Sequence, residues 1–187
     1  MIILASASPR RRELLGYIAP EFEVRPTGCD ESCGRTDGEG RVLELSMRKA
    51  LAAREHAAAG DAVIAADTVV ELDGEILEKP RDREDALRML HALSGRTHTV
   101  CTGVAMCFRG KTYSFCEKTR VTFCRLREEQ LVAYVDSGEP MDKAGAYGMQ
   151  GAGSFMVERV EGDPYNVIGL PVCALNRLLW DVGALGG

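Results

Sequence analysis

The chain opens with MIILASASPRRRELL, residues 1–15, and this stretch points to the class of fold. Its first six residues are typical of a short buried strand, because an apolar run is closed by small residues. Ser8 and Pro9 then match the N-cap and the first turn of a helix, and helical spacing puts the apolar residues that follow on one face. A strand that leads straight into a helix favours an α/β fold.

The same two patterns recur along the rest of the chain. Helices are expected over 8–18, 41–59, 83–95, 127–138 and 167–183, and strands over 1–6, 22–28, 62–74, 97–108 and 111–126. The last two strands form a predicted hairpin about an Arg-Gly-Lys turn. Residues 29–40 are expected to be a polar loop or early helix, and 142–163 a loop, a short strand and a turn. Strands and helices mix without strict alternation, so we expect a mixed sheet with helices on its faces.

Length and charge limit the kinds of protein that this chain can be. Its 187 residues are enough for one domain with a full core, and 45% hydrophobic with 27% charged residues is typical of a globular protein. A formal net charge of −5 argues against a partner such as nucleic acid or a membrane surface, because binding either needs a basic field. A phosphate site would therefore have to be a local basic pocket.

The chain is expected to be cytoplasmic. Its first apolar run is far shorter than that of a signal peptide, and no run approaches the ~20 apolar residues that span a bilayer. The seven cysteines are odd in number and scattered, which fits reduced thiols better than a disulfide framework. Cys29 and Cys33 are close enough to suggest a metal pair, but no partner at ligand spacing lies nearby, so small apolar filling is favoured.

Three adjacent arginines, Arg10 to Arg12, follow the first strand. Cations at a helix N-terminus oppose the helix dipole, so a nearby anion would offset that cost. Ser6, Ala7 and Ser8 are small enough for backbone N–H groups to approach an oxyanion, and a phosphate chain is the natural candidate. The alternative is a structural cluster of salt bridges.

A second signal is Asp67, which is followed by Thr68 inside the otherwise apolar run AVIAADTVV. A buried acid is rare unless it is paired, metal-bound or catalytic, although it could also accept backbone hydrogen bonds at a strand end. Lys49 and Lys79 could supply further cations or be ordinary surface residues. Glu31 could share a divalent cation with Asp67, because magnesium takes one or two carboxylates plus phosphate oxygens and water.

Several other kinds of site are disfavoured. Neither the phosphate-loop motif nor the dinucleotide-binding glycine motif is present, which argues against kinase and Rossmann-type functions. The three histidines have no nucleophile at a motif spacing, so packing or surface roles are favoured for them over catalysis.

Five ordered stretches together resemble a known family. They are LASASPRRRELL, AADTVV, EKPRDREDALRMLHALSGRTHTVCTGVA, DKAGAYGMQG and VERVEGDPYNVIGLPV. In this order they resemble the Maf family of nucleoside triphosphate pyrophosphatases, which is named for septum formation, and the resemblance covers nearly the whole chain. It implies a single Maf-like domain over 1–187.

The resemblance also implies a fold and a reaction. The fold would be a mixed, elongated, twisted α/β sheet with helices on its faces and two lobes around a central cleft, similar to the inosine triphosphate pyrophosphatases. The reaction would be metal-dependent hydrolysis of a nucleoside triphosphate, dTTP or UTP, to the monophosphate and pyrophosphate, with Mg²⁺ or Mn²⁺. House-cleaning of nucleotide pools and a role in cell-division arrest are further implications. A homodimer is usual in that family, which makes it one possible state of this chain, and the sequence itself does not give the oligomeric state.

Residues of this chain match the family's functional positions. Asp67 matches the catalytic acid, and Arg10, Thr68 and Gln150 match the positions that set substrate specificity. Ser8, Arg11, Glu31, Lys49 and Lys79 match polar positions of the triphosphate and metal cleft, with Asp67 and Glu31 as the metal ligands.

Three alternatives remain at this point. The chain could be a non-catalytic nucleotide-binding regulator of septum formation, which needs the cations but not Asp67. It could instead be a pyrophosphatase for a modified purine nucleotide such as 7-methyl-GTP, or a metal-dependent phosphomonoesterase that releases orthophosphate.

Overall fold

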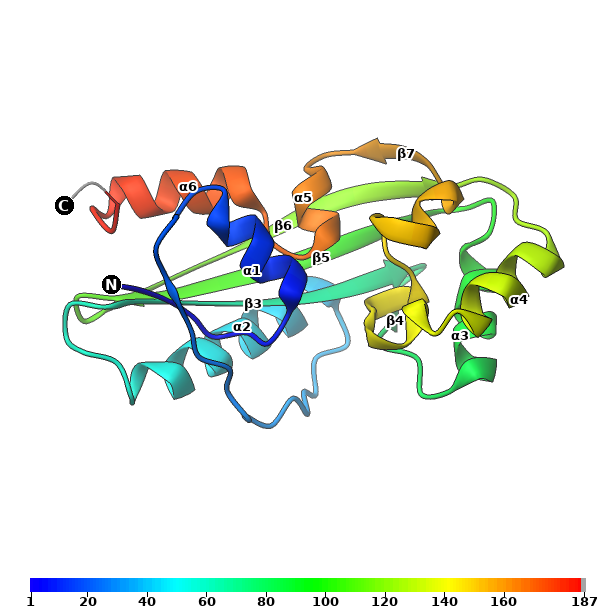
Figure 1. Cartoon of the computed structure of the whole chain (residues 1–187). Helices are drawn as coiled ribbons and strands as arrows, with labels where there is room; N and C mark the ends of the chain where they lie inside the picture. The colour runs from blue at the N-terminus through cyan, green and yellow to red at the C-terminus, as the bar shows by residue number, and fades with distance from the viewer. Residues whose placement is uncertain (186–187) are drawn as a thin grey trace.

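The computed structural model describes residues 1–185, and seven strands form one mixed sheet within them (Figure 1). The last two residues of the predicted 1–187 domain lie outside the described part of the chain. The strands are β1 (Ile2–Leu4), β2 (Glu23–Val24), β3 (Ala62–Leu72), β4 (Glu75–Leu77), β5 (Thr97–Phe108), β6 (Lys111–Phe123) and β7 (Val157–Glu161).

Six α-helices and three 3₁₀-helices connect these strands within residues 1–185. The α-helices are α1 (Pro9–Gly16), α2 (Gly38–Arg54), α3 (Arg83–Leu93), α4 (Glu128–Asp136), α5 (Pro164–Ile168) and α6 (Val172–Asp181). The 3₁₀-helices are η1 (Glu139–Asp142), η2 (Ala144–Ala146) and η3 (Gly151–Met156). No helix in this part of the chain is both long and apolar enough to cross a membrane.

The strand order in the sheet is β2-β1-β3-β5-β6-β7, with β4 paired to β3. The pairs β2–β1 and β1–β3 are parallel, and the other pairs are antiparallel. β5 and β6 form the predicted hairpin, and its turn residues Arg109 and Gly110 have φ of 47° and 73°. Positive φ at both central positions matches the right-handed twist of the strands. The predicted mixed sheet is confirmed.

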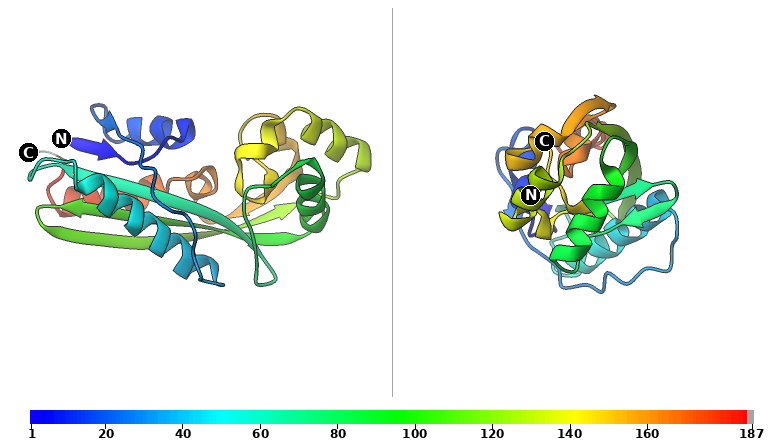
Figure 2. Two further views of the ribbon diagram at one scale, coloured as in Figure 1. Left: turned by 90° about the horizontal axis from the view of Figure 1, so that it is seen from below. Right: turned by 90° about the vertical axis from the view of Figure 1, so that its right-hand side faces the viewer.

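The elongated sheet carries two lobes. In Figure 1, α1 and α6 lie on one face of the sheet toward the chain termini, and α5 lies on the same face near the middle of the sheet. α2 lies on the opposite face, and α3 and α4 lie at the far end. β5 and β6 run the length of the molecule and join the two lobes (Figure 2). β3 also takes part in both, because Ile64 packs in the core beneath α1 and α6, Val63 in the core beneath α2, and Val70 in the core of the second lobe.

The edge of β3 is uncovered between the two lobes. β5 pairs with one edge of β3 from Val63 to Glu71, so β1 and β4 must share the other edge. On that edge β1 pairs no further than Ile64, and β4 begins to pair only at Val70. The side chains of Asp67 and Thr68 fall in the gap, where the buried pattern of the strand is interrupted. This interruption of the sheet edge is the place where the chain can form a site.

Several expected boundaries were wrong, for identifiable reasons. The helix predicted over 41–59 begins at Gly38, where the Asp37 side chain caps it, and ends at Arg54. The helix predicted over 167–183 is two helices, because Gly169 adopts φ of 125° and Pro171 follows it. The segment 142–163 contains 3₁₀ turns before its strand, and β4 was not predicted.

Candidate active site

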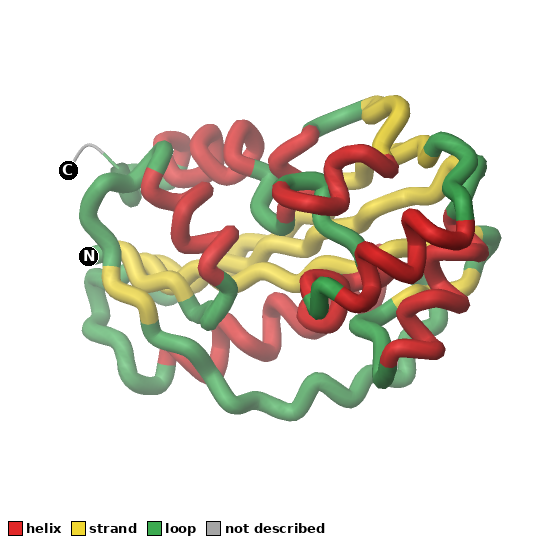
Figure 3. The backbone as a smooth tube through the Cα atoms, turned by 45° about the vertical axis from the view of Figure 1, so that its right-hand side comes forward, coloured by secondary structure: helices red, strands yellow, loops and turns green. Residues whose placement is uncertain are grey.

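A cleft of about 540 Å³ opens at the uncovered edge of β3. This volume lies within the ~300–1,000 Å³ that is usual for ligand pockets. Its walls come from the turn between β1 and α1, from α2 and β3, from the loop that precedes α2, and from the η1–η2 region of the second lobe. Figure 3 shows the loop between β2 and α2 as a long segment without regular structure.

Positive charge exceeds negative charge in this cleft. Its lining includes six cationic side chains, Arg10, Arg11, Arg41, Lys49, Lys79 and Lys143, and four acidic ones, Glu31, Asp67, Glu78 and Asp142. The whole chain has a formal net charge of −5, so this excess is local. A local basic pocket in an acidic protein attracts an anionic ligand without making the whole surface bind polyanions.

The turn after β1 places Arg11 at the base of the cleft. Ser8 caps α1, and its Oγ accepts from the Arg11 backbone N–H at 3.4 Å. The Arg11 guanidinium donates from Nε to the Gly169 carbonyl at 2.9 Å, from Nη1 to Ser6 Oγ at 3.4 Å and from Nη2 to Thr68 Oγ1 at 3.1 Å. Burial lowers the pKa of Arg11, and the charge of Asp67 opposes this effect.

Arg11 is therefore a partly buried cation held by neutral acceptors. Among residues 1–185, no carboxylate lies within ion-pair distance of it. A buried charge is costly unless it is paired, and a guanidinium has five N–H donors, of which three are used here. The two remaining donors and the lack of a directly bonded carboxylate among residues 1–185 favour an anionic ligand.

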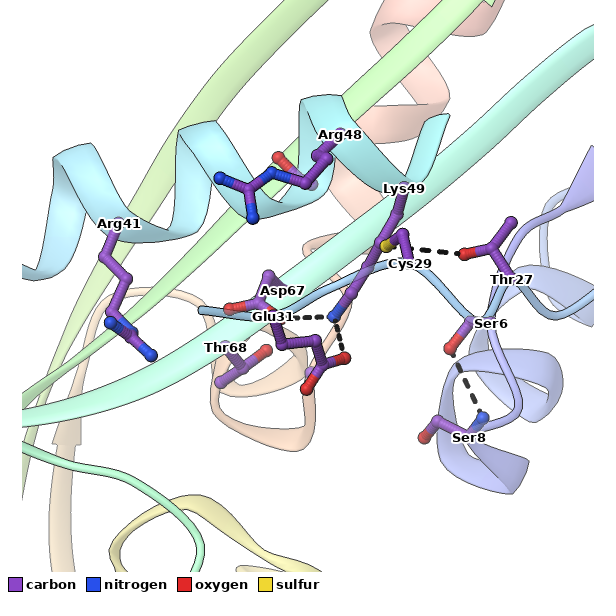
Figure 4. A network of polar contacts seen from close by, with 12 residues as sticks. Ser6, Ser8, Thr27, Cys29, Glu31, Arg41, Arg48, Lys49, Asp67 and Thr68 are labelled. Atoms are coloured by element: carbon purple, nitrogen blue, oxygen red, sulfur yellow. Dashed lines mark hydrogen bonds and ion pairs between the residues drawn. The ribbon is translucent and has the colours of Figure 1, made fainter. Parts of the chain in front are cut away.

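Lys49 on α2 reaches between two carboxylates on the other side of β3. Its Nζ lies 2.6 Å from Asp67 Oδ1 and 2.8 Å from Glu31 Oε1 (Figure 4). The Lys49 and Asp67 side chains are 11% and 13% exposed, whereas Glu31 is 59% exposed. The hydrogen bond from Lys49 holds the pKa of Glu31 below its ordinary value, so Glu31 is ionised at neutral pH.

Asp67 and Thr68 act on opposite faces because successive strand residues point in opposite directions. Asp67 points to the face covered by α2 and meets Lys49, and Thr68 points to the face covered by α1 and α5 and meets Arg11. These two consecutive residues therefore contact different groups of side chains, one on each face of the strand. Among the described residues, Asp67 Oδ2 accepts no hydrogen bond, so one carboxylate oxygen is available for a ligand or water.

The second lobe contributes a different set of groups. Arg10 Nη1 on α1 lies 3.2 Å from Asp142 Oδ2, and this ion pair connects the two lobes across the cleft. Lys143 Nζ contacts Asp142 Oδ1 at 2.8 Å and donates to the Glu139 carbonyl at 2.6 Å. Gln150 is exposed at the cleft, just before η3.

All nine residues singled out from the sequence line this one cleft. They are Ser8, Arg10, Arg11, Glu31, Lys49, Asp67, Thr68, Lys79 and Gln150. Sequence reasoning missed Arg41, Glu78, Asp142 and Lys143, which also line it. Asp142 and Lys143 begin DKAGAYGMQG, one of the five stretches that resemble the Maf family, but the resemblance assigns no role to these two residues. Arg41 lies near the start of α2, and nothing in its sequence context distinguishes it from a surface residue of that helix.

The fold is an elongated mixed α/β sheet with helices on its faces and a cleft between two lobes. The solved structure titled "Structure of a HAM1 protein from Coxiella burnetii" is similar, with a TM-score of 0.54 over 96% of this chain and 98% of that one. The two sequences are 12% identical, so this likeness shows the fold alone.

The sequence comparisons identify the family. The family described as Maf-like protein matches residues 1–182, and the chain belongs to this Maf family. A relative from Thermosipho africanus named "dTTP/UTP pyrophosphatase" is 47% identical over 98% of this chain and 94% of its own length. Relatives with the same name from Thermococcus kodakarensis and Bacillus anthracis are each 46% identical, over 100% and 95% of this chain and 97% and 93% of their own lengths.

Proposed function

We propose that this chain hydrolyses dTTP and UTP to the nucleoside monophosphate and pyrophosphate. The observation that carries the proposal is the arrangement on β3: the Arg11 guanidinium donates to Thr68 on one face of the strand, and the carboxylate of Asp67, the residue before Thr68, lies on the other face. A triphosphate brings about four negative charges, and phosphoryl transfer is stabilised chiefly by positioned cations. The name shared by relatives of 46–47% identity supports the same substrate class.

The proposed roles follow from the two sides of β3. Arg11, Arg10 and Lys79 would bind the phosphate chain, and Ser8 would present its backbone and hydroxyl at the N-terminus of α1. Asp67 would accept a proton from the water that attacks the α–β anhydride, with Lys49 holding the carboxylate in place. The bond between the α- and β-phosphates breaks, and pyrophosphate leaves.

The residues present fit a divalent metal ion. Glu31 and Asp67 contact the same Lys49 ammonium group, so their carboxylates lie close together, and a metal ion would bind beside this ammonium through their other oxygens. Carboxylate oxygens are the donors that Mg²⁺ and Mn²⁺ prefer. No cluster of three or more potential metal-ligating side chains occurs within residues 1–185, so phosphate oxygens and water would complete the shell. When bound, the ion would neutralise charge on the phosphates and acidify water.

Several further expectations stay predictions. A single domain over 1–187 is supported by β3, β5 and β6, because strands that run through both lobes make separate folding of either lobe unfavourable. The homodimer, the house-cleaning role and the role in cell-division arrest rest on the family resemblance alone, and the cytoplasmic location rests on the sequence patterns described above.

The test is to identify the phosphate species released from UTP. The purified chain and its Asp67→Asn variant are incubated with UTP and Mg²⁺ or Mn²⁺, and UMP, pyrophosphate and orthophosphate are separated and quantified. We expect equal amounts of UMP and pyrophosphate from the parent, no activity in EDTA, and at least a ~10²-fold lower rate from Asp67→Asn. The amide keeps the size of the carboxylate but accepts no proton at neutral pH.

Each other outcome selects a different function. Release of orthophosphate instead of pyrophosphate would indicate the phosphomonoesterase-type alternative. Tight UTP binding without turnover would indicate the regulator, and turnover of 7-methyl-GTP in preference to UTP would indicate the modified-purine enzyme. Activity of Asp67→Asn within tenfold of the parent would remove Asp67 from the catalytic role.

A further inference from the structure

Behind Arg11 lies a buried network of polar side chains that has no role in the reaction proposed above. Thr102 on β5, Thr119 on β6 and Asn166 on α5 are all fully buried. Asn166 belongs to the stretch GDPYNVIGLP, which carried part of the family resemblance but supplied no residue to the predicted site. Buried hydroxyl and amide groups destabilise the fold unless they are well hydrogen-bonded. The presence of three such groups here therefore indicates a structural or functional role.

One line of hydrogen bonds connects Arg11 to Asn166. Arg11 Nη2 donates to Thr68 Oγ1 at 3.1 Å, the Thr68 and Thr102 hydroxyl oxygens lie 2.9 Å apart, and Thr102 Oγ1 donates to the Asn166 backbone carbonyl at 3.0 Å. Thr68 and Thr102 are directly paired in the β3–β5 register, which brings their hydroxyls together.

Only one arrangement of protons satisfies this line. A guanidinium can only donate and a carbonyl can only accept, so the two ends are fixed. Thr102 gives its single hydroxyl proton to the Asn166 carbonyl, and Thr68 must then give its proton to Thr102. The lone pairs of Thr68 are thereby directed to Arg11, and its proton is turned away from the cleft.

Asn166 also fixes the second acceptor of Arg11. Its Nδ2 donates to the Val100 carbonyl at 3.0 Å and to Thr119 Oγ1 at 2.9 Å, which ties the short helix α5 to two central strands. One residue past the end of α5, the Gly169 carbonyl accepts from Arg11 Nε at 2.9 Å. The direction of the Thr68 hydroxyl therefore depends on the Asn166 backbone carbonyl through Thr102, and the position of Gly169 depends on the Asn166 side chain through α5.

The amide of Asn166 has a fixed orientation despite an unpaired atom. Its Oδ1 is buried and has no hydrogen-bond partner in the described part of the chain, yet the reversed amide would place that oxygen against the Val100 carbonyl. An unsatisfied buried oxygen is uncommon and calls for an explanation. The two donors of this amide hold α5 in place, which explains why the unpaired oxygen is tolerated.

We propose that Thr102 and Asn166 are positioning residues that fix the Arg11 guanidinium toward the phosphate chain of the substrate. This inference rests on the proposed function for the identity of the ligand. It assigns the GDPYNVIGLP stretch a role in phosphate binding, although neither Thr102 nor the Asn166 side chain lines the cleft.

The test compares three substitutions on the same hairpin. Thr102→Val keeps the shape of the side chain and removes its hydroxyl, and Thr102→Ser keeps the hydroxyl. Thr122→Val is the matched control, because Thr122 Oγ1 also lies 2.9 Å from a threonine oxygen across β5 and β6, that of Thr97, outside the cleft. Each is made with Arg11 present and with Arg11→Ala. Asn166→Ala is a second variant should Thr102→Val fail to fold, which thermal unfolding will show.

Two measurements are made on every protein: kcat/KM for UTP, and binding of inorganic triphosphate with Mg²⁺ by calorimetry. With Arg11 present, we expect Thr102→Val and Asn166→Ala to lower both by about fivefold or more, the effect of losing one buried hydrogen bond. In the Arg11→Ala background we expect less than a twofold effect, since the residue being positioned is gone. Thr102→Ser and Thr122→Val should stay within twofold of the parent.

The outcomes separate this inference from the proposed function. If the parent binds triphosphate but releases no pyrophosphate from UTP, the proposed pyrophosphatase function is refuted. The triphosphate-binding measurements on the variants then decide the positioning role on their own. Equal losses with and without Arg11 would show a merely structural role and overturn the inference, as would unchanged binding in Thr102→Val. A parent that does not bind triphosphate overturns both.

Discussion

Arg11 and Arg12 are neighbours with the same side chain, yet only Arg11 lines the cleft. Arg12 is exposed on the outer face of α1, whereas Arg11 is held by Gly169, Ser6 and Thr68. Helical geometry alone separates them, because adjacent residues are rotated by about 100° around the axis. The pair therefore offers a comparison in which charge, size and sequence position are nearly matched.

We expect Arg11→Ala to lower kcat/KM for UTP by about 100-fold or more, because a fixed cation that binds the reacting phosphates is lost. Arg12→Ala should stay within twofold. Steady-state kinetics at two salt concentrations check this, and salt should raise the KM of the parent, since the cleft is open to solvent. Equal effects of the two substitutions would show that the arginines act only through the general charge of the surface and that Arg11 has no specific role in the cleft.

His98 on β5 is a buried histidine beside the second-lobe core. Its Nε2 lies 2.7 Å from the Tyr147 hydroxyl, and its ring packs edge-on against Phe123. Within residues 1–185, its Nδ1 has no hydrogen-bond partner. Burial lowers the pKa of His98 to about 4 from the usual 6.5. His98 is therefore neutral in the folded chain at neutral pH, as the packing role expected from the sequence requires.

In the unfolded chain the His98 imidazole binds a proton below about pH 6.5, whereas in the folded chain it binds one only near pH 4. The free energy of unfolding should therefore fall as the pH drops from 6.5 to 4. The loss should reach up to about 3 kcal/mol. Denaturant unfolding at pH 7, 6 and 5 measures it. His98→Leu should flatten the pH dependence, and the exposed His91→Leu should preserve it. The idea fails if both variants keep the slope of the parent.

At the scale of elements, α2 approaches the sheet most closely at Gly103. A Cβ at this position would lie 2.4 Å from the Val42 carbonyl oxygen, which is backbone and cannot move aside. Gly103 pairs directly with Asp67 in the β3–β5 register, and Lys49 follows Val42 by seven residues on the same helix face. The absence of a side chain at Gly103 lets α2 bring Lys49 to Asp67.

We expect Gly103→Ala to destabilise the fold by about 1–3 kcal/mol through overpacking and to lower kcat by displacing Lys49. Gly60→Ala is the matched control, because nothing lies within 4 Å of a Cβ there. Thermal unfolding and UTP hydrolysis measure the two effects. Gly103→Ala with parental stability would mean that α2 does not pack as closely as described.

Elements with strong local patterns were predictable from the sequence. The β5–β6 hairpin and the strand-to-helix start at Ser8 depend on alternation, turn glycine and capping, which neighbouring residues specify. The two-part end of the chain and the 3₁₀ turns before β7 were not predicted. Their conformations depend on contacts with distant segments, such as the Gly169 carbonyl with Arg11.

The candidate site was predictable to a similar extent. Asp67 was noticed because an acid interrupts an apolar strand, and the structure shows that it falls where β1 and β4 leave the edge of β3 uncovered. No sequence pattern showed that Thr68 and Thr102 would pair across the sheet, because the register between strands is a tertiary property.

At the scale of the whole molecule, the cleft divides its groups between the two lobes. Asp67, Lys49 and Arg11 belong to the first lobe, whereas Gln150 belongs to the second. The segment that carries Gln150 is held firmly: Glu139 accepts from the Ala152 N–H at 3.1 Å, and Tyr134 accepts from the Gly148 N–H at 3.1 Å. Phosphate chemistry and base recognition are therefore separable by substitution.

Gln150 is proposed to recognise the base, with Thr68 shaping the floor of the pocket. A glutamine amide offers one donor and one acceptor side by side, which complements O4 and N3–H of uracil or thymine. A reversed amide would complement cytosine, so selectivity depends on neighbours that hold one orientation. The fixed segment around Gln150 supplies such a constraint on the backbone.

We expect the parent to favour UTP and dTTP over CTP by roughly ten- to a hundredfold, since an unpaired buried polar group costs ~1–3 kcal/mol. Gln150→Ala should flatten the UTP/CTP ratio of kcat/KM more than it lowers hydrolysis of the best remaining nucleotide, because Asp67 and Lys49 lie on the other lobe. Gln130→Ala, which replaces the only other glutamine, is the control and should keep the ratio. An unaltered ratio in Gln150→Ala, or a parental preference for GTP or ITP, would refute base recognition by Gln150 while leaving the pyrophosphatase reaction in place.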